Sequence, residues 1–204
     1  MIRFIKYYSL EIYTVITMAF MLIAALIGDL SIIQKFVLVF AFLFLLHEWE
    51  EGVYPGGFFD KFSEILQVES NEELRRITRV PVDIVLLIIT IIPFCFHNYM
   101  IPVLMTSTLA ILEGVVHIGF IKLFRMEKFY SPGMVTAEIM FVVSIIFYVY
   151  IAKHNMATGL DYLFGTLLMI ITFIIMQRSL VKIIGIKNYL DVPKLVIKRI
   201  KNQE

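Results

Sequence analysis

Residues 32–46 form an almost unbroken apolar run, IIQKFVLVFAFLFLL, in which Lys35 is the only ionisable side chain. A helix that is apolar on all sides must be buried, either in the core of a large protein or in a membrane. The chain has only 204 residues, of which 60% are hydrophobic and 17% are charged. Soluble domains have roughly 45–50% apolar and about 25% charged residues. The composition therefore excludes a soluble globular domain and predicts an all-α, polytopic membrane protein.

Six segments are apolar enough to span a bilayer, which takes about 17–25 residues. They lie near residues 11–28, 31–48, 81–98, 100–123, 133–152 and 159–178, and turn formers or polar residues separate them. We therefore expect a six-helix transmembrane bundle over residues 1–178. Residues 179–204 are expected to form a basic amphipathic tail on the inner membrane surface. In the loop before the third span, Ser70 and Glu73 have the spacing of a capping box and predict a separate short helix.

The distribution of positive charge predicts the orientation, because cytoplasmic loops carry the excess of Lys and Arg. If the N-terminus is inside, only Lys35 and Lys153 of the 18 Lys and Arg residues fall on the outer side. The other 16 fall on the inner side: Arg3, Lys6, Lys61, Arg75, Arg76, Arg79, Lys122, Arg125, Lys128, Arg178, Lys182, Lys187, Lys194, Lys198, Arg199 and Lys201. This split predicts that both termini are cytoplasmic. Since topology organises the basic residues, the expected partner is the lipid bilayer and not a nucleic acid.

Ionisable residues occur within or at the ends of these apolar segments, where they are costly and mark functional sites. His47 lies three residues before Glu50 and four before Glu51, so one face of a helix presents all three. Glu113 and His117 are also four residues apart, in the middle of the fourth span. Each of these two spans therefore has one face that carries both an imidazole and a carboxylate.

The two faces are expected at the same depth in the membrane. His47 and His117 each lie 16 residues into a span that runs inward, or about 24 Å at the helical rise of 1.5 Å per residue. The same rise places Glu113 and Glu138 in this slab of the inner leaflet. Histidine side chains more than about 10 Å apart could not share a metal ion, because ligand bonds are about 2 Å long.

Two imidazoles and several carboxylates are typical ligands of iron, zinc or manganese within a helical bundle. The sequence therefore predicts a divalent-metal site with the ligands His47, Glu50, Glu51, Glu113 and His117. Glu50 and Glu138 are also candidates for acid–base catalysis. An enzyme of this kind would be a metal-dependent hydrolase or oxidase that acts on a lipid or a lipid-linked substrate.

Three other interpretations use the same residues. The His and Glu side chains would serve as a proton relay in a small transporter or channel. In a non-catalytic membrane subunit, the buried pairs would only fix the packing of helices. Finally, Glu48, Glu50 and Glu51 would be solvated if the second span leaves the membrane at this point, with Trp49 in the interfacial belt of aromatic residues.

The segment His47-Glu48-Trp49-Glu50-Glu51 fits an H-x-x-E-E motif, and a further histidine, His117, and the segment Tyr130-Ser131-Pro132-Gly133 follow it. In this combination and order, the chain resembles the HXXEE family of bacterial membrane proteins. The resemblance implies a multi-pass protein of the bacterial inner or plasma membrane, and it implies no activity. The Tyr130–Gly133 segment is either a turn that starts the fifth span, with Ser131 as the cap, or a contribution to the site through the Tyr130 hydroxyl.

Overall fold

The computed structural model describes residues 2–123, 126 and 129–201, so that Arg125 and Lys128 of the predicted inner loop lie outside the described residues. The described chain is all-helical, and six of its helices are long and apolar enough to cross a membrane. The predicted fold class is therefore confirmed. The six long helices are α2 (Ser9–Ile27), α3 (Ile32–Gly52), α5 (Glu72–Cys95), α6 (Met100–Leu123), α7 (Met134–Lys153) and α8 (Gly159–Ile183).

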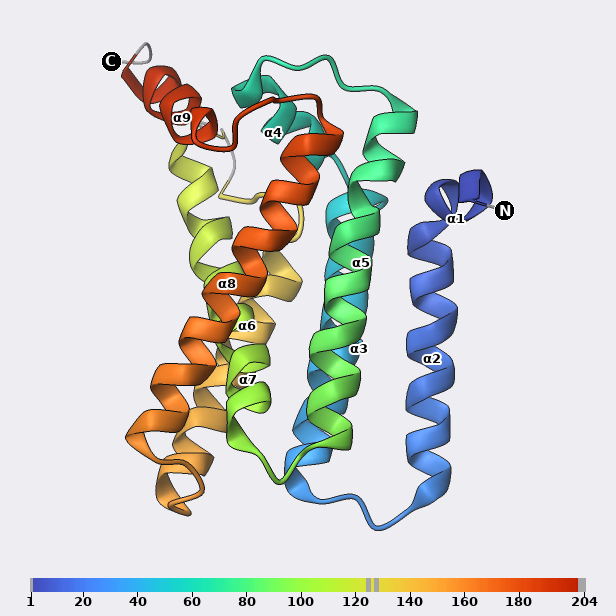
Figure 1. Ribbon diagram of the computed structural model, residues 1–204, viewed down its shortest axis with the longest axis vertical. Coiled ribbons are helices and arrows are strands. Elements are labelled where there is room, and N and C mark those ends of the chain that lie inside the picture. Colours follow the sequence, from blue (N-terminus) through green and yellow to red (C-terminus); the bar gives the residue numbers. More distant parts are fainter. Residues whose placement is uncertain (1, 124–125, 127–128, 202–204) are drawn as a thin grey trace.

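Three shorter helices lie at one end of this bundle, together with both ends of the chain (Figure 1). They are α1 (Ile2–Tyr7), α4 (Phe58–Leu66) and α9 (Asp191–Lys201). The predicted tail thus consists of the last turn of α8, a connection and α9, and α9 packs against α4. The other end of the bundle carries short connections only, as expected for helices that alternate in direction.

Polar side chains define where several long helices begin. Ser31 and Gln34 form a capping box at the start of α3, and Thr158 and Asp161 form another at the start of α8. Each box satisfies backbone N–H groups that have no partner within the helix. At α5, the cap is Asn71, whose side chain accepts from the Leu74 N–H at 2.8 Å.

Helix α5 begins at Glu72 and not near residue 81. The short helix that was expected after Ser70 is the first part of α5, which continues through Pro81. Proline lacks an N–H and removes one helical hydrogen bond, a loss that packing against neighbouring helices can offset. The Ser70 hydroxyl does not cap α5 but donates to the Asp60 carboxylate.

Helices α3 and α6 are the inner elements of the bundle. In each of them 50% of the most apolar 18-residue window is buried, against 17% in α8 and 22% in α2. Helix α3 packs against α2, α5, α6 and α7, and α6 packs against α3, α5, α7 and α8. The two histidines predicted to form a site therefore lie on the two most enclosed helices.

Candidate metal centre

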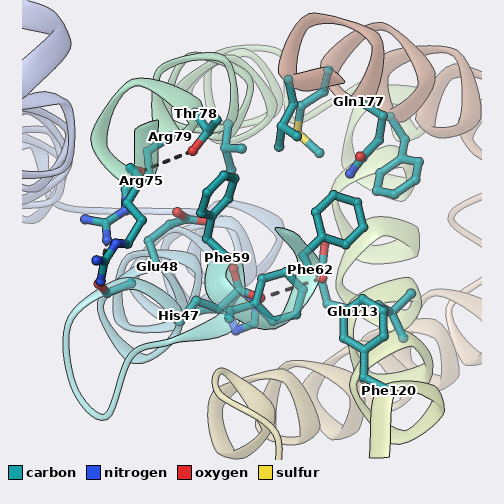
Figure 2. Close-up of a pocket in the computed structure, with 18 of the residues that line it drawn as sticks. His47, Glu48, Phe59, Phe62, Arg75, Thr78, Arg79, Glu113, Phe120 and Gln177 are labelled. Atoms are coloured by element: carbon teal, nitrogen blue, oxygen red, sulfur yellow. Dashed lines mark hydrogen bonds and ion pairs between the residues drawn. The ribbon is translucent and has the colours of Figure 1, made fainter. Parts of the chain in front are cut away.

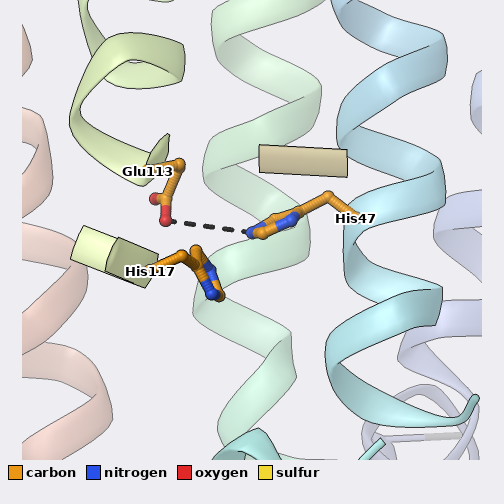
Figure 3. Close-up of side chains that lie close together, drawn as sticks. All are labelled: His47, Glu113 and His117. Carbon is orange, nitrogen blue, oxygen red and sulfur yellow. Dashed lines mark ion pairs between the residues drawn. The ribbon is translucent and has the colours of Figure 1, made fainter. Parts of the chain in front are cut away.

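The structure brings His47 of α3 together with Glu113 and His117 of α6 (Figure 3). The two imidazole rings lie 5.0 Å apart between centroids, well within the separation that a shared ion allows. His47 is 3% exposed and His117 is fully buried. One potential ligand atom from each of the three residues lies within 4.8 Å of the others. The predicted convergence of the two helix faces is confirmed.

Glu51 completes this arrangement from the turn of α3 that follows His47. Its Oε1 lies 3.0 Å from His117 Nε2 and 3.5 Å from His47 Nε2. His47 Nε2 lies 3.8 Å from Glu113 Oε2. Ligand bonds of about 2 Å place ligand atoms about 3–4 Å from one another. These three separations are compatible with a shared ion, and His47, Glu113 and His117 are the group that could hold it, with Glu51 beside them. We call His47, Glu51, Glu113 and His117 the His/Glu cluster.

Both imidazoles turn their other nitrogen, Nδ1, towards the segment that leads into α7. His47 Nδ1 lies 3.1 Å from the Gly133 carbonyl oxygen, which can only accept a hydrogen bond. His117 Nδ1 lies 3.0 Å from Ser131 Oγ, and the Ser131 hydroxyl in turn donates to the His117 carbonyl at 3.2 Å. His47 Nδ1 is therefore the donor to the Gly133 carbonyl, and His117 Nδ1 is the donor to Ser131 while the Ser131 hydroxyl donates to the His117 carbonyl.

The Nε2 atoms of the neutral imidazoles consequently carry lone pairs, and both of these lone pairs face carboxylates. His117 Nε2 is buried and has no hydrogen-bond partner among the described residues, although Glu51 Oε1 is only 3.0 Å away. Facing acceptors in a buried site repel each other unless a proton or a metal cation lies between them. A hydrogen bond from Nδ1 to an oxygen is also the usual way in which proteins orient a histidine that binds metal through Nε2.

Gly133 makes this close packing sterically feasible. Its φ is +90°, a conformation that favours glycine. A Cβ atom at this position would lie 2.5 Å from Glu51 Cγ, 2.7 Å from His117 Cε1 and 2.9 Å from His47 Cε1. The glycine of the Y-x-P-G segment is therefore in direct contact with three residues of the His/Glu cluster.

Glu50 lies on the same side of α3 but binds the start of α7 instead of the His/Glu cluster. Its carboxylate accepts from the backbone N–H groups of Val135 at 3.1 Å and Thr136 at 2.9 Å. It also accepts from the hydroxyls of Thr136 at 2.6 Å and Tyr130 at 3.0 Å. These contacts give Glu50 the role of a cap for α7, whose first N–H groups have no helical partner.

Tyr130 therefore contacts Glu50, through the hydrogen bond from its hydroxyl, and makes no such bond to the His/Glu cluster itself among the described residues. Burial, together with the hydrogen bond to the Glu50 carboxylate, raises the pKa of the Tyr130 hydroxyl. The hydroxyl thus remains protonated, and a donor, at neutral pH. The predicted catalytic roles of Glu50 and Tyr130 stay predictions, and the hydrogen bonds of both residues are those of groups that position α7.

Two other acidic residues lie away from the His/Glu cluster. In the described part of the chain, no hydrogen bond or ion pair connects Glu138 of α7 with the cluster, and its Oε1 is buried without a partner. The catalytic role of Glu138 stays a prediction. Asp83 of α5 is 4% exposed, and neither of its carboxylate oxygens has a hydrogen-bond partner among the described residues.

A cavity of about 350 Å³ adjoins the His/Glu cluster (Figure 2). His47, Glu51 and Glu113 line it, and three phenylalanines of α4, Phe58, Phe59 and Phe62, cover it. Much of the remaining wall is apolar and comes from α6, α8, the segment before α9 and the first turn of α9, with the residues Val116, Phe120, Phe173, Met176, Leu180, Tyr189 and Val192. The predicted site thus has room beside it for a largely apolar ligand.

Sequence reasoning missed several polar residues of this cavity, which are Glu48, Arg75, Thr78, Arg79 and Gln177. Glu48 follows His47 and was expected to face elsewhere or to be solvated, but it is only 5% exposed. Helix α5 brings Arg79 to the cavity from another part of the chain, and no spacing within the motif signals this. The contacts by which Ser131, Gly133 and Thr136 orient the side chains of the site were also not predicted, because they depend on how the chain returns into α7.

No curated protein and no solved structure matches this chain. One comparison does identify its family. The model of a family described as a protein of unknown function with HXXEE motif matches residues 38–149, a range that contains the whole His/Glu cluster and Gly133. Because the match covers more than half of the 204 residues, the chain belongs to the HXXEE family, to which no activity is assigned.

Proposed function

We propose that this protein is a metal-dependent membrane enzyme that acts on a lipid or a lipid-linked substrate. The observation that carries the proposal is the pair of buried Nε2 atoms that face carboxylate oxygens at 3.0–3.8 Å. A metal cation would stabilise this arrangement of facing acceptors, because it would bind all of them at once. Iron, zinc and manganese are the ions that suit two imidazoles and two carboxylates.

In this proposal, His47 and His117 bind the ion through Nε2, and Glu51 and Glu113 bind it through their carboxylates. Ser131 and the Gly133 carbonyl hold the imidazoles in the required tautomer. A bound divalent ion supplies a Lewis acid that activates water or oxygen at neutral pH.

A general acid–base in this site would be a carboxylate beside the metal. Glu48 lines the cavity beside the His/Glu cluster, whereas Glu50 is engaged at α7. Among the described residues, Glu48 makes no ion pair that would occupy its oxygens. We therefore assign to Glu48 the exchange of protons with a substrate in the cavity.

The substrate class follows from the cavity and its surroundings. Its walls are mainly aromatic and aliphatic, with the polar groups concentrated near the His/Glu cluster. Pockets of this kind bind the apolar body of a ligand and fix its orientation with a few polar groups. In a bundle of apolar helices, the compounds that reach such a cavity are lipids or molecules linked to lipids.

Metal analysis of the purified, detergent-solubilised protein tests the proposal. We expect close to one equivalent of iron, zinc or manganese and its loss in His117→Ala. His154→Ala is the matched control, because it removes an exposed imidazole far from the His/Glu cluster and should leave the metal content unchanged. Metal below about 0.1 equivalent in the unaltered protein, after reconstitution with each ion, would overturn the metal site.

Two other outcomes would support the interpretations that compete with this one. Metal-free protein that conducts protons in liposomes, with loss of flux in Glu113→Gln, would indicate a relay. Metal-free protein whose Glu113→Gln variant only fails to assemble would indicate a structural subunit. Either result contradicts the enzyme proposed here.

A further inference from the structure

The cavity beside the His/Glu cluster also has cationic groups on its wall. Arg75 and Arg79 of α5 both line it, and they are four residues apart on one face of the helix (Figure 2). Guanidinium groups bind carboxylates and phosphates through parallel hydrogen bonds. A cavity with apolar walls, a metal-ligating cluster and two arginines is therefore suited to an amphiphile with an anionic head group.

The partners of the neighbouring arginines show which of them is available. Arg76 faces away from the cavity and binds Glu72 at 3.2 Å and Glu11 at 3.5 Å. Arg75 binds Asp60 of α4 at 3.4 Å, with both side chains partly exposed. Arg79 donates to the Gly52 carbonyl, and no carboxylate lies within 4.0 Å of its guanidinium in the part of the chain that the structure describes. Arg79 thus has the capacity to bind an added anion.

Gly52 connects Arg79 with the metal-binding segment. It directly follows Glu51, and the Arg79 guanidinium lies against its Cα. A Cβ atom at Gly52 would come within 2.5 Å of Arg79 Nη2 and 2.6 Å of Arg79 Cζ. Helix α3 therefore provides Glu51 of the His/Glu cluster and, one residue later, Gly52. The absence of a side chain at Gly52 leaves room for the Arg79 guanidinium, and the Gly52 carbonyl oxygen accepts its hydrogen bond.

We infer that the cavity binds a phosphate-bearing amphiphile whose head group has a net negative charge, with the phosphate on Arg79 and Arg75 and the hydrocarbon against the phenylalanines of α4 and α8. This inference names the substrate class of the site proposed above, and its reactive part rests on that proposal. A phosphate group satisfies the donors of Arg79 that Gly52 leaves unused. It also places a lipid head group within the same cavity as the His/Glu cluster.

Binding to the purified full-length protein tests this inference. The probes are phosphatidylglycerol, phosphatidylcholine with the same acyl chains, and inorganic phosphate, each measured by native mass spectrometry or a thermal-shift titration. We expect phosphatidylglycerol to bind about tenfold more tightly than phosphatidylcholine, because the choline cation of phosphatidylcholine offsets the phosphate charge and is repelled by the arginines. Phosphatidylcholine bound as tightly as phosphatidylglycerol would overturn the anionic head group, and inorganic phosphate bound as tightly would overturn the amphiphile.

Variants assign the preference to Arg79. Arg79→Gln should abolish the preference for phosphatidylglycerol, and Arg79→Lys should restore part of it. Arg76→Gln is the matched control, since this arginine precedes Arg79 on α5 but is paired away from the cavity. An equal loss in Arg76→Gln would show a general effect of surface charge and contradict the inference.

Gly52→Ala keeps the arginine but removes the space for it. Alanine suits a helix, and the atoms that it would displace belong to the flexible end of Arg79, so we expect a folded protein that has lost the preference. Gly119→Ala, on α6 and with no atom within 4 Å of the added Cβ, is its control. A Gly52→Ala protein with the full preference would contradict the placement of the phosphate on Arg79.

The metal and the head group are measured separately, so the two proposals can fail separately. Protein with one equivalent of metal and no head-group preference would refute the inference and leave the metal centre. Metal-free protein with an Arg79-dependent preference would refute the metal centre and leave a lipid-binding site.

Discussion

Among single residues, Gly133 combines two constraints, a positive φ and contact with three members of the His/Glu cluster. We predict that Gly133→Ala lowers metal affinity by about 10–100-fold, the usual effect of disturbing residues that orient ligands. The added Cβ would displace Glu51, His47 or His117 from its position. Competition with a chelator of known affinity measures the change.

A second glycine separates the effect of contact from that of backbone strain. Gly185 has a φ of +91°, but no atom lies within 4 Å of a Cβ built there. Gly185→Ala should therefore lose a similar amount of stability and keep its metal affinity. If both variants bind metal as the unaltered protein does, the contacts of Gly133 do not shape the site.

The residues of the His/Glu cluster could be predicted because helical spacing fixes which side chains share a face. His47 and Glu51, and likewise Glu113 and His117, are four residues apart, and the two pairs contact each other in the structure. The contacts of Ser131 and Gly133 could not be predicted in the same way. They depend on the path of a loop, and no periodicity describes such a path.

At the scale of elements, α3 and α7 are coupled through Glu50, which accepts four hydrogen bonds at the start of α7. We predict that Glu50→Gln lowers the free energy of unfolding by about 1–3 kcal/mol, because the amide has only one acceptor oxygen and turns N–H groups towards other donors. Thermal unfolding in detergent, followed by circular dichroism, measures this loss.

The same substitution at a surface position provides the comparison. Among the residues that the structure describes, Glu64 of α4 pairs only with Lys61, at 3.3 Å, and both side chains are about half exposed. Glu64→Gln should change the unfolding free energy by less than about 0.5 kcal/mol. Equal effects of the two substitutions would mean that the cap on α7 contributes nothing.

The sequence predicted the six long helices better than their ends. Apolar composition located all six, because a span must be apolar along its whole length. It placed the third span near residues 81–98 with a separate short helix before it, whereas a single helix, α5, starts at Glu72 and continues through Pro81. The packing of α9 on α4 was also not predicted, because a basic amphipathic pattern fits a membrane surface and a neighbouring helix equally well.

For the whole molecule, the structure fixes which parts lie at the same end of the bundle. Both termini and the helices α1, α4 and α9 lie at one end of the bundle (Figure 1). The cavity belongs to this end, since α4 and the segment before α9 line it. The excess of Lys and Arg predicts that this end is cytoplasmic, so a lipid substrate would enter from the inner leaflet.

Labelling of single cysteines tests this orientation. Cys95, the only native cysteine, is first replaced by serine. We expect Met156→Cys, in the exposed connection between α7 and α8, to react with a membrane-impermeant maleimide in intact cells. Lys187→Cys, in the exposed connection between α8 and α9, should react only after the membrane is permeabilised, and both should react in detergent. The reverse pattern would contradict this orientation. It would place the cavity and its arginines at the outer leaflet, and the inferred phospholipid would then enter from the outer leaflet.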